Sequence, residues 1–409
     1  MTSDFIELNF NKMEQSLSDH IKEKFSQLTN REDLLTLLNL ANKHLHSNKA
    51  LDFELKQLNW YSNPAINKRR YKTFSIQKKS GAERKIHAPV KTLKYIQQAL
   101  CFVLECVFEP HKAAYGFVKN KSIVDNAQNH VGQIYVYNID LKDFFPSIEA
   151  GRLFSRLQYP PFSLSDKRDV ANVITWLCTE KLEVERFNKE NSTWEAKELN
   201  VLPQGAPTSP LITNIICYKL DYVLSAVAKR FGLKYSRYAD DITFSSMHNV
   251  YQKNSEFLTE LKRVIQDQNF HIKESKTRLQ KDGFRKEVTG LLVHESANVH
   301  KRYIKQLRMW LYYWERYGYE KAYGFFLPQY VGDRGNVKKG NPNMENVIGG
   351  KLEYLKMVKG VENELYLKLK DRLSILIGYT EPINQILDVW EIEGIEKLWK
   401  FIIRINETK

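Results

Sequence analysis

Three acidic side chains are spaced as the ligands of metal ions would be. Asp140 ends a β-rich run at residues 134–140, and Asp240 and Asp241 form the turn between two β-rich arms at residues 233–246. Mg²⁺ binds carboxylate oxygens, and a pair of Mg²⁺ ions can neutralise the charge that develops during nucleotidyl transfer. An isolated Asp-Asp pair is more often an ordinary turn. A second acidic strand end nevertheless favours a site for two Mg²⁺ ions, which Mn²⁺ can replace.

Apolar patterns predict the elements that position these acids. Residues 71–88 alternate between apolar and polar side chains around a Lys-Ser-Gly turn, which predicts a basic β-hairpin. Thr29 and Glu32 have the spacing of a helix capping box, and Ser209 followed by proline favours another helix start. Helices are expected at residues 30–45, at 93–108, from Ser209 to Val227, at 255–268, and through most of the chain after residue 300.

The composition indicates a globular protein with several parts and an anionic partner. A length of 409 residues predicts two or three subdomains. Lys and Arg number 62 against 48 Asp and Glu, and this surplus of +14 favours nucleic acid. The chain start has no basic segment followed by an apolar one, so no membrane contact and a cytoplasmic location are expected. Four scattered cysteines predict buried thiols, without disulfides or zinc.

Three segments, in their order along the chain, resemble the palm motifs of reverse transcriptases. Residues 138–148 (NIDLKDFFPSI) are similar to motif A, residues 202–215 (LPQGAPTSPLITNI) to motif B, and Tyr-Ala-Asp-Asp to motif C. The resemblance implies an enzyme, an RNA-directed DNA polymerase. It also implies that the three acids hold two Mg²⁺ ions together with the backbone carbonyl of Leu141.

The same resemblance assigns contacts to the substrate. It implies that the Gln204-Gly205 turn approaches the template and the incoming nucleotide, and that Lys78 and Arg84 of the basic hairpin bind the triphosphate. It places Phe145 beside the sugar, where a ring leaves no room for a 2′-hydroxyl and therefore favours deoxynucleoside triphosphates. A basic hairpin taken alone is more often solvated surface.

Two further residues belong to this argument. Lys276 falls where motif D would be, and a lysine near the leaving group can act as a general acid or as a counter-charge. Phe144 precedes Phe145, and if both lie on a strand their side chains point to opposite faces, so that only one of them can be in the core.

Two short segments resemble signatures of retron reverse transcriptases: Asn126-Ala127-x-x-His130 and Val288-Thr289-Gly290. The resemblance, which covers roughly residues 70–310, implies a polymerase that copies its own structured non-coding RNA into single-stranded DNA. It further implies a role in bacterial defence against phage with an effector protein. An oligomeric assembly remains open.

The family has a right-hand α+β architecture, which implies fingers, a palm built on an antiparallel sheet, and a helical thumb. The corresponding division of this chain is an N-terminal helical extension at residues 1–50, fingers at 51–133, a palm at 134–295 with a finger-like insertion at about 150–203, and a thumb with an RNA-binding region at 296–409. In the last part, Arg302, Lys305 and Arg308 alternate with aromatic residues and are expected to contact nucleic acid. The rings can equally be core.

Other functions fit parts of the sequence. The extended segment at residues 180–200 and the N-terminal extension leave open a defence-associated reverse transcriptase outside the retrons, or a relative of group II intron enzymes. An inactive RNA-binding scaffold has no need for clustered carboxylates that repel one another. A polymerase that makes RNA is disfavoured by Phe145.

Overall fold

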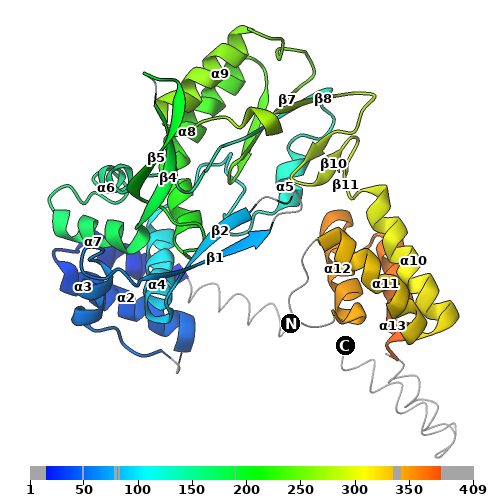
Figure 1. Ribbon diagram of the computed structural model, residues 1–409, viewed down its shortest axis with the longest axis horizontal. Helices are drawn as coiled ribbons and strands as arrows, with labels where there is room; N and C mark the ends of the chain where they lie inside the picture. Colours follow the sequence, from blue (N-terminus) through cyan, green and yellow to red (C-terminus); the bar gives the residue numbers. More distant parts are fainter. Residues whose placement is uncertain are drawn as a thin grey trace, which may run out of the picture. The chain divides into compact units, whose positions relative to one another are not determined.

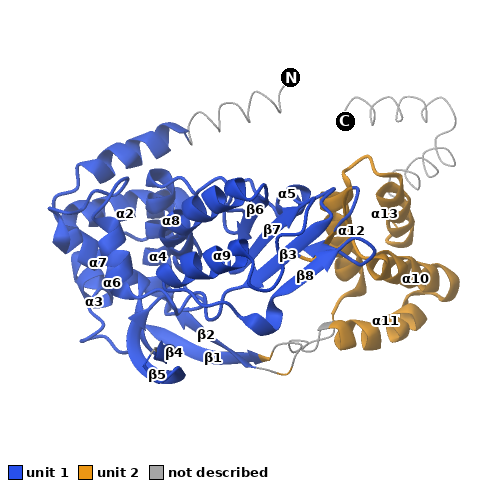
Figure 2. Ribbon diagram, turned by 90° about the horizontal axis from the view of Figure 1, so that it is seen from above, with its two compact units in different colours: residues 1–76, 82–289, 293–295 blue, residues 77–81, 290–292, 296–409 orange. Residues whose placement is uncertain are grey.

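The computed structural model describes residues 15–47, 50–77, 81, 83–188, 190–334 and 342–378. The protein is a mixed α+β structure that divides into two compact units (Figures 1 and 2). Unit 1 comprises residues 1–76, 82–289 and 293–295, and unit 2 comprises residues 77–81, 290–292 and 296–409. The expected mixture of helices and strands is confirmed.

Unit 1 holds a four-stranded antiparallel sheet with strand order β6-β7-β3-β8. Two separate hairpins, β1–β2 and β4–β5, accompany it. Short strands β9, β10 and β11 follow where the chain passes from one unit to the other. The strands are β1 Tyr71–Gln77, β2 Glu83–Pro89, β3 Tyr135–Asp140, β4 Glu180–Asn188, β5 Thr193–Val201, β6 Lys234–Tyr238, β7 Asp241–Ser246, β8 Arg278–Lys281, β9 Glu287–Val288, β10 Leu291–Val293 and β11 Ala297–Asn298.

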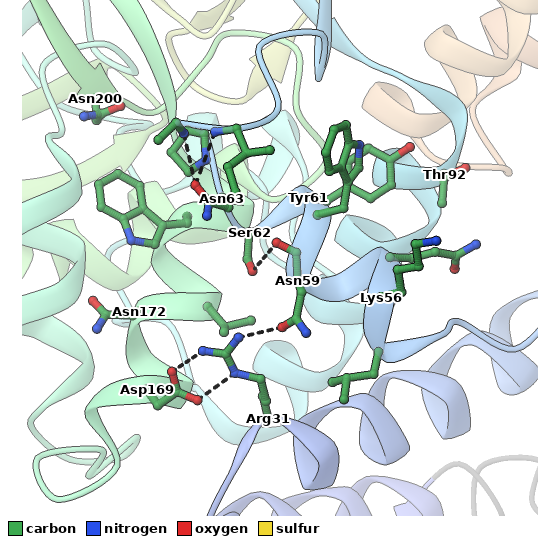
Figure 3. A pocket seen from close by; sticks show the side chains of 18 of the residues that line it. Arg31, Lys56, Asn59, Tyr61, Ser62, Asn63, Thr92, Asp169, Asn172 and Asn200 are labelled. Carbon is green, nitrogen blue, oxygen red and sulfur yellow. Dashed lines mark hydrogen bonds and ion pairs between the residues drawn. The ribbon is translucent and has the colours of Figure 1, made fainter.

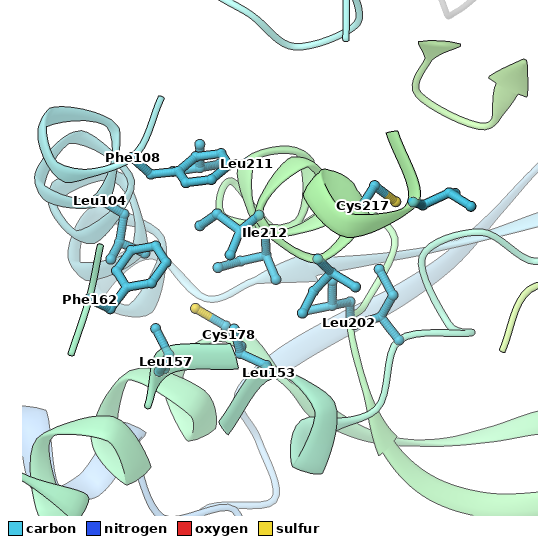
Figure 4. Packing of buried hydrophobic residues seen from close by; sticks show 14 of the residues in the cluster. Leu104, Phe108, Leu153, Leu157, Phe162, Cys178, Leu202, Leu211, Ile212 and Cys217 are labelled. Atoms are coloured by element: carbon cyan, nitrogen blue, oxygen red, sulfur yellow. The ribbon is translucent and has the colours of Figure 1, made fainter. Parts of the chain in front are cut away.

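Helices form the apolar interior of unit 1. Leu104 of α4, Leu153 of α6 and Ile212 of α8 are fully buried in one cluster (Figure 4). In the described part of the chain, α8 alone is long and apolar enough to cross a membrane, and 67% of its most apolar stretch is buried, as in a core helix. The helices are α2 Arg31–His46, α3 Leu55–Tyr61, α4 Lys91–Val107, α5 Ile123–Gln128, α6 Ala150–Leu157, α7 Arg168–Cys178, α8 Ser209–Arg230, α9 Glu256–Asp267 and the 3₁₀ turn η2 Glu274–Lys276.

The described part of unit 2 is mainly helical. It contains α10 Lys301–Tyr317, α11 Tyr319–Arg334, α12 Met344–Lys359 and α13 Glu364–Leu376. Gly318 has a φ of +76°, a conformation that glycine adopts without strain, and it separates α10 from α11. Trp310 and Trp314 are buried, whereas Tyr312 is exposed.

Several sequence expectations need correction. Asn30, not Thr29, caps α2, and its capping-box partner is Asp33 instead of Glu32, because the helix begins one residue later than the pattern suggested. Thr208 is the N-cap of α8, and Ser209 is already helical. The hairpin expected at 71–88 and the strand at 134–140 are confirmed, and the extended segment at residues 180–200 forms the β4–β5 hairpin.

Candidate active site

The register of the central sheet brings the three acids together. In the antiparallel pairing of β3 with β7, Asp140 is the direct partner of Asp241. Ala239 and Asp240 form the turn between β6 and β7, since Tyr238 pairs with Asp241. The backbone N–H of Leu141 donates to the carbonyl of Asp240 at 3.1 Å. The carboxylates therefore lie at one edge of the sheet, as the sequence predicted for strand ends.

The turn that carries Asp240 is tightly constrained. Ala239 has a φ of +56°, a left-handed conformation that non-glycine residues rarely adopt. The side chain of Ala239 is buried, and Gly116 packs directly against it. A Cβ atom on Gly116 would lie 2.5 Å from the backbone nitrogen of Ala239, so only glycine permits this approach.

The site holds uncompensated negative charge. Burial, together with the charge of Asp140, raises the pKa of Asp240. Although solvent reaches the side chain of Asp241, the surrounding protein atoms and the carboxylates of Asp240 and Asp140 raise its pKa to about 6. Mutual repulsion of this kind is relieved by a bound cation.

Lys276 partly relieves that repulsion. Its Nζ atom lies 2.5 Å from Oδ2 of Asp140, and it comes from the 3₁₀ turn η2. Burial lowers the pKa of Lys276, but the hydrogen bond to Asp140 and the charges of the three acids outweigh burial, so the pKa is raised. The side chain that the sequence suggested as an acid or counter-charge is thus in contact with the acids.

The donors fit Mg²⁺ in their chemistry, because three carboxylates meet at one sheet edge. The pKa values of Asp240 and Asp241 are raised, and Asp140 is paired with Lys276. In the described part of the chain, no three His, Cys, Asp or Glu side chains form a ready-made metal-binding cluster. Asp140 is instead bound by Lys276. We expect metal binding to require the release of this contact.

The backbone near Leu141 also fits the predicted role of its carbonyl. The hydrogen bonds that join this segment to residues 271–273 use the carbonyl of Asp140 and the N–H of Lys142. They leave the Leu141 carbonyl outside the ladder. The side chain of Leu141 is buried in the core, so only its backbone is offered to the site.

The Gln204-Gly205 turn lies against the basic hairpin. The N–H of His87 in β2 donates to the carbonyl of Gln204 at 2.8 Å. Gly205 has a φ of +124°, and a Cβ there would lie 2.8 Å from the carbonyl oxygen of His87. Arg84, on the same strand, is exposed. Its positive charge opposes, but does not cancel, the rise that burial causes in the pKa of Asp240. Lys78 lies outside the described residues.

Phe145 is half-buried, and its surroundings differ from those of Phe144. Residues 142–147 form turns instead of a strand, so the argument from alternating strand faces does not apply. Phe144 is buried against Phe270, with ring centroids 5.7 Å apart. The ring centroids of Phe145 and Phe117 lie 6.3 Å apart, and Phe117 is exposed. Phe144 is therefore the core residue, whereas Phe145 is partly exposed and packs against the outside of the core.

The three cations predicted to bind nucleic acid lie in unit 2, on α10. Arg302, Lys305 and Arg308 are all exposed, and their spacing puts them on one face of the helix. The buried face holds Leu307 and Trp310 instead. Arg302 is paired with Asp333 at 2.7 Å. Exposure suits these cations to bind a phosphate backbone.

The two short signature segments contact each other in unit 1. The Asn126 side chain donates to Oγ1 of Thr289 at 3.4 Å, and the Thr289 hydroxyl donates to the carbonyl of Ile123 at 3.2 Å. His130 is fully buried and is hydrogen-bonded at 2.7 Å to the hydroxyl groups of Ser236 and Ser245. His130 therefore binds β6 and β7 of the central sheet, and Thr289 joins the two signature segments.

A pocket of about 1420 Å³ lies away from the acids. It is formed around α3 and α7, where Arg31 binds both Asp169 and Asn59, and Trp60 and Trp176 line it (Figure 3). None of the three acids borders it. Size alone does not identify the site, because the chemistry is concentrated at the strand ends.

Sequence reasoning missed Arg237 and Asp221. Both side chains are completely buried and form an ion pair at 2.6 Å directly behind the acidic turn. The signal was present in the sequence: Arg237 lies in a strand between two tyrosines, and Asp221 follows Leu220 on an apolar helix. A charged residue in such a setting needs a buried partner.

Comparisons with known proteins give the family. The family model described as reverse transcriptase (RNA-dependent DNA polymerase) matches residues 76–312. The Retron Mx162 reverse transcriptase of Myxococcus xanthus is 35% identical over 279 residues, which cover 64% of this chain and 56% of that protein. The Retron Ec86 reverse transcriptase of Escherichia coli is 34% identical over 247 residues, which cover 58% of this chain and 68% of that protein. The chain therefore belongs to the retron-type reverse transcriptases.

The match is partial in length. The chain spans little more than half of the Mx162 protein. A solved structure of telomerase from Candida albicans with a fragment of telomeric RNA is 10% identical and covers 80% of this chain and 66% of that chain, with a TM-score of 0.36. A score this low carries no weight for the fold.

Proposed function

We propose that this protein is an RNA-directed DNA polymerase that copies a cognate structured non-coding RNA into single-stranded DNA. The observation that carries the proposal is the pairing of Asp140 with Asp241, which gathers three carboxylates beside Lys276 at one sheet edge. Membership of the retron-type family supports it. The template RNA, deoxynucleoside triphosphates and a defence effector are the partners, in the cytoplasm.

The residues divide the work of nucleotidyl transfer among them. Asp140, Asp240, Asp241 and the Leu141 carbonyl would hold two Mg²⁺ ions. When bound, these ions neutralise charge on the phosphates and on the attacking and leaving oxygens. Lys276, which contacts Asp140, would donate a proton to the leaving pyrophosphate or neutralise its charge.

The remaining residues select and orient the substrates. Arg84 and Lys78 bind the triphosphate, and the Gln204-Gly205 turn contacts the template and the incoming nucleotide. Phe145 excludes a 2′-hydroxyl. In the corresponding right-hand architecture, residues 51–133 are the fingers, 134–295 the palm, and 296–409 the thumb, where Arg302, Lys305 and Arg308 bind the duplex.

Primer extension tests the proposal. Purified protein with Mg²⁺, deoxynucleotides and a primed RNA template should make DNA, and Asp240→Asn should lower the rate on the order of 10³-fold. Asp267→Asn is the matched control, since Asp267 is an exposed acid on α9 paired with Arg263. No product from the wild type, or full activity of Asp240→Asn, would refute the proposed activity.

A further inference from the structure

The buried guanidinium of Arg237 contacts three residues of unit 1. Its Nε and Nη2 atoms donate to the two carboxylate oxygens of Asp221 on α8, at 2.8 and 2.6 Å. Nη1 donates to the backbone carbonyl of Ala239 in the acidic turn at 3.2 Å. Nη2 also donates to Oδ1 of Asn214 at 3.0 Å. One side chain thus links the acidic turn to α8 at two points.

The same network reaches the loop that packs on the turn. The N–H of Arg237 donates to the carbonyl of Ala113, and its carbonyl accepts from the N–H of Tyr115, both at 2.8 Å. The Asn214 amide donates to the carbonyl of Gly116 at 3.0 Å. Gly116 is the residue that touches Ala239. Besides its pairing with β3, the turn is therefore held by contacts that meet at Arg237 and Asn214.

Energetics favour positioning over stability as the reason for this pair. Burying an ion pair costs desolvation that the attraction often only offsets, so apolar side chains of similar shape would stabilise the protein equally well. What a guanidinium adds is a planar fork of donors with fixed directions. Ala239, held in a left-handed conformation, is the residue next to Asp240.

We propose that Arg237 and Asp221 are positioning residues that fix the acidic turn against α8 and thereby set the affinity of the three carboxylates for divalent ions. The inference rests on the proposed function. In this proposal Arg237 and Asp221 are not metal ligands and do not contact the substrate. They act through the backbone of Ala239.

The chain offers a matched control for a buried arginine. Arg70 is also completely buried, is paired with Glu180 at 2.6 Å, and donates to the carbonyls of Tyr61, Trp176 and Thr179. It lies in the region of α3 and α7 and has no contact with the acidic turn. Substitution of Arg70 therefore reports what losing a buried arginine does to stability alone.

The test compares the full-length variants Arg237→Lys, Arg237→Met, Asp221→Asn and Arg70→Lys. Mn²⁺ affinity is measured by electron paramagnetic resonance, the melting temperature in EDTA by circular dichroism, and primer extension as a function of Mg²⁺. Arg237→Lys keeps a positive charge for Asp221 but cannot reach Asp221, Asn214 and Ala239 at once. It should weaken Mn²⁺ affinity about 10-fold or more, whereas Arg70→Lys should change it less than about 2-fold.

The outcomes separate this inference from the proposed function. Similar melting temperatures for Arg237→Lys and Arg70→Lys, with weaker Mn²⁺ affinity only in the former, support positioning. Unchanged Mn²⁺ affinity in Arg237→Lys overturns it. If Arg237→Met does not fold, the lysine variant decides. If the wild type makes no DNA, the proposed function fails, yet the difference in Mn²⁺ affinity still decides the inference.

Discussion

The β6–β7 and β4–β5 hairpins of unit 1 are both antiparallel strand pairs, but their surroundings differ. The β6–β7 hairpin is buried, with Arg237 bound to α8 on one face and His130 bound to Ser236 and Ser245 on the other. The β4–β5 hairpin is largely exposed, and pairs such as Lys181 with Glu198 join its strands. Buried, directional contacts fix a turn in one place, whereas exposed ion pairs contribute about 1 kcal/mol or less.

Trp194 provides the clearest attachment of the exposed hairpin. Its ring lies 3.3 Å from Nζ of Lys142, and Lys142 also pairs with Glu185 at 2.8 Å. This attachment is to the segment that follows Asp140, and the side chains that form it are exposed or only partly buried. The comparison predicts that changes near the β6–β7 turn affect catalysis strongly and that changes in β4–β5 do so weakly.

Among changes outside the three carboxylates, the largest effect is expected from Gly116→Ala. The added Cβ would lie 2.5 Å from the nitrogen of Ala239, so the acidic turn must move. A displacement of this size should lower the primer-extension rate about 100-fold or more. The control is Gly151→Ala, where a Cβ meets nothing within 4 Å. Equal rates in the two variants would show that the turn is not tightly positioned.

The next effect concerns sugar selection. Phe145→Ala should raise the use of ribonucleotides relative to deoxynucleotides about 10- to 100-fold, because the ring no longer blocks a 2′-hydroxyl. Competition between the two nucleotide types in primer extension measures this ratio. Phe284→Ala, at an exposed ring, serves as the control. An unchanged ratio would assign sugar selection to another residue.

A smaller effect, on stability, is expected from His130, which packs on the face of the β6–β7 hairpin opposite Arg237. Burial, and to a lesser extent Lys234, lowers the pKa of His130 to about 3, below the ordinary value of 6.5. Between pH 6.5 and 3, His130 is therefore protonated in the unfolded chain but neutral in the folded protein. The stability that the neutral, buried His130 contributes is present above pH 6.5 and is lost as the pH falls toward 3. The free energy of unfolding should change by up to about 1.4 kcal/mol per pH unit in that window.

His130→Gln tests that dependence. The variant should be less stable at neutral pH by about 1–3 kcal/mol, because the two serine hydroxyls lose well-placed partners. It should also show a flatter dependence of stability on pH between 6.5 and 3. Urea unfolding at a series of pH values measures both. A wild-type slope that survives in the variant would mean that other groups cause it.

The smallest effect is expected in the exposed hairpin. Ser192 in the β4–β5 loop has a φ of +51°, close to the +56° of Ala239. Ser192→Val imposes strain of about 1–3 kcal/mol there, but the primer-extension rate should change less than about 2-fold, since Ser192 is an exposed loop residue. A loss comparable to that of Gly116→Ala would remove the distinction between the hairpins.

The sequence predicted the position of the three acids better than it predicted the residues that support them. Asp140, Asp240 and Asp241 were recognisable because strand patterns and the order of motifs identify strand ends. The Asp221–Arg237 pair was not, because a contact between residues 16 positions apart on a helix and a strand depends on how these pack. The environments of Phe144 and Phe145 were not predictable either, because residues 142–147 form turns instead of continuing the strand.

The central claim is that the carboxylates at the ends of β3 and β7 hold the divalent ions for DNA synthesis. The most direct test counts Mn²⁺ ions bound to the protein with a primed RNA template and a non-hydrolysable deoxynucleotide analogue, by electron paramagnetic resonance. We predict two bound ions for the wild type and fewer for Asp240→Asn. The same number and affinity in both proteins would contradict the account.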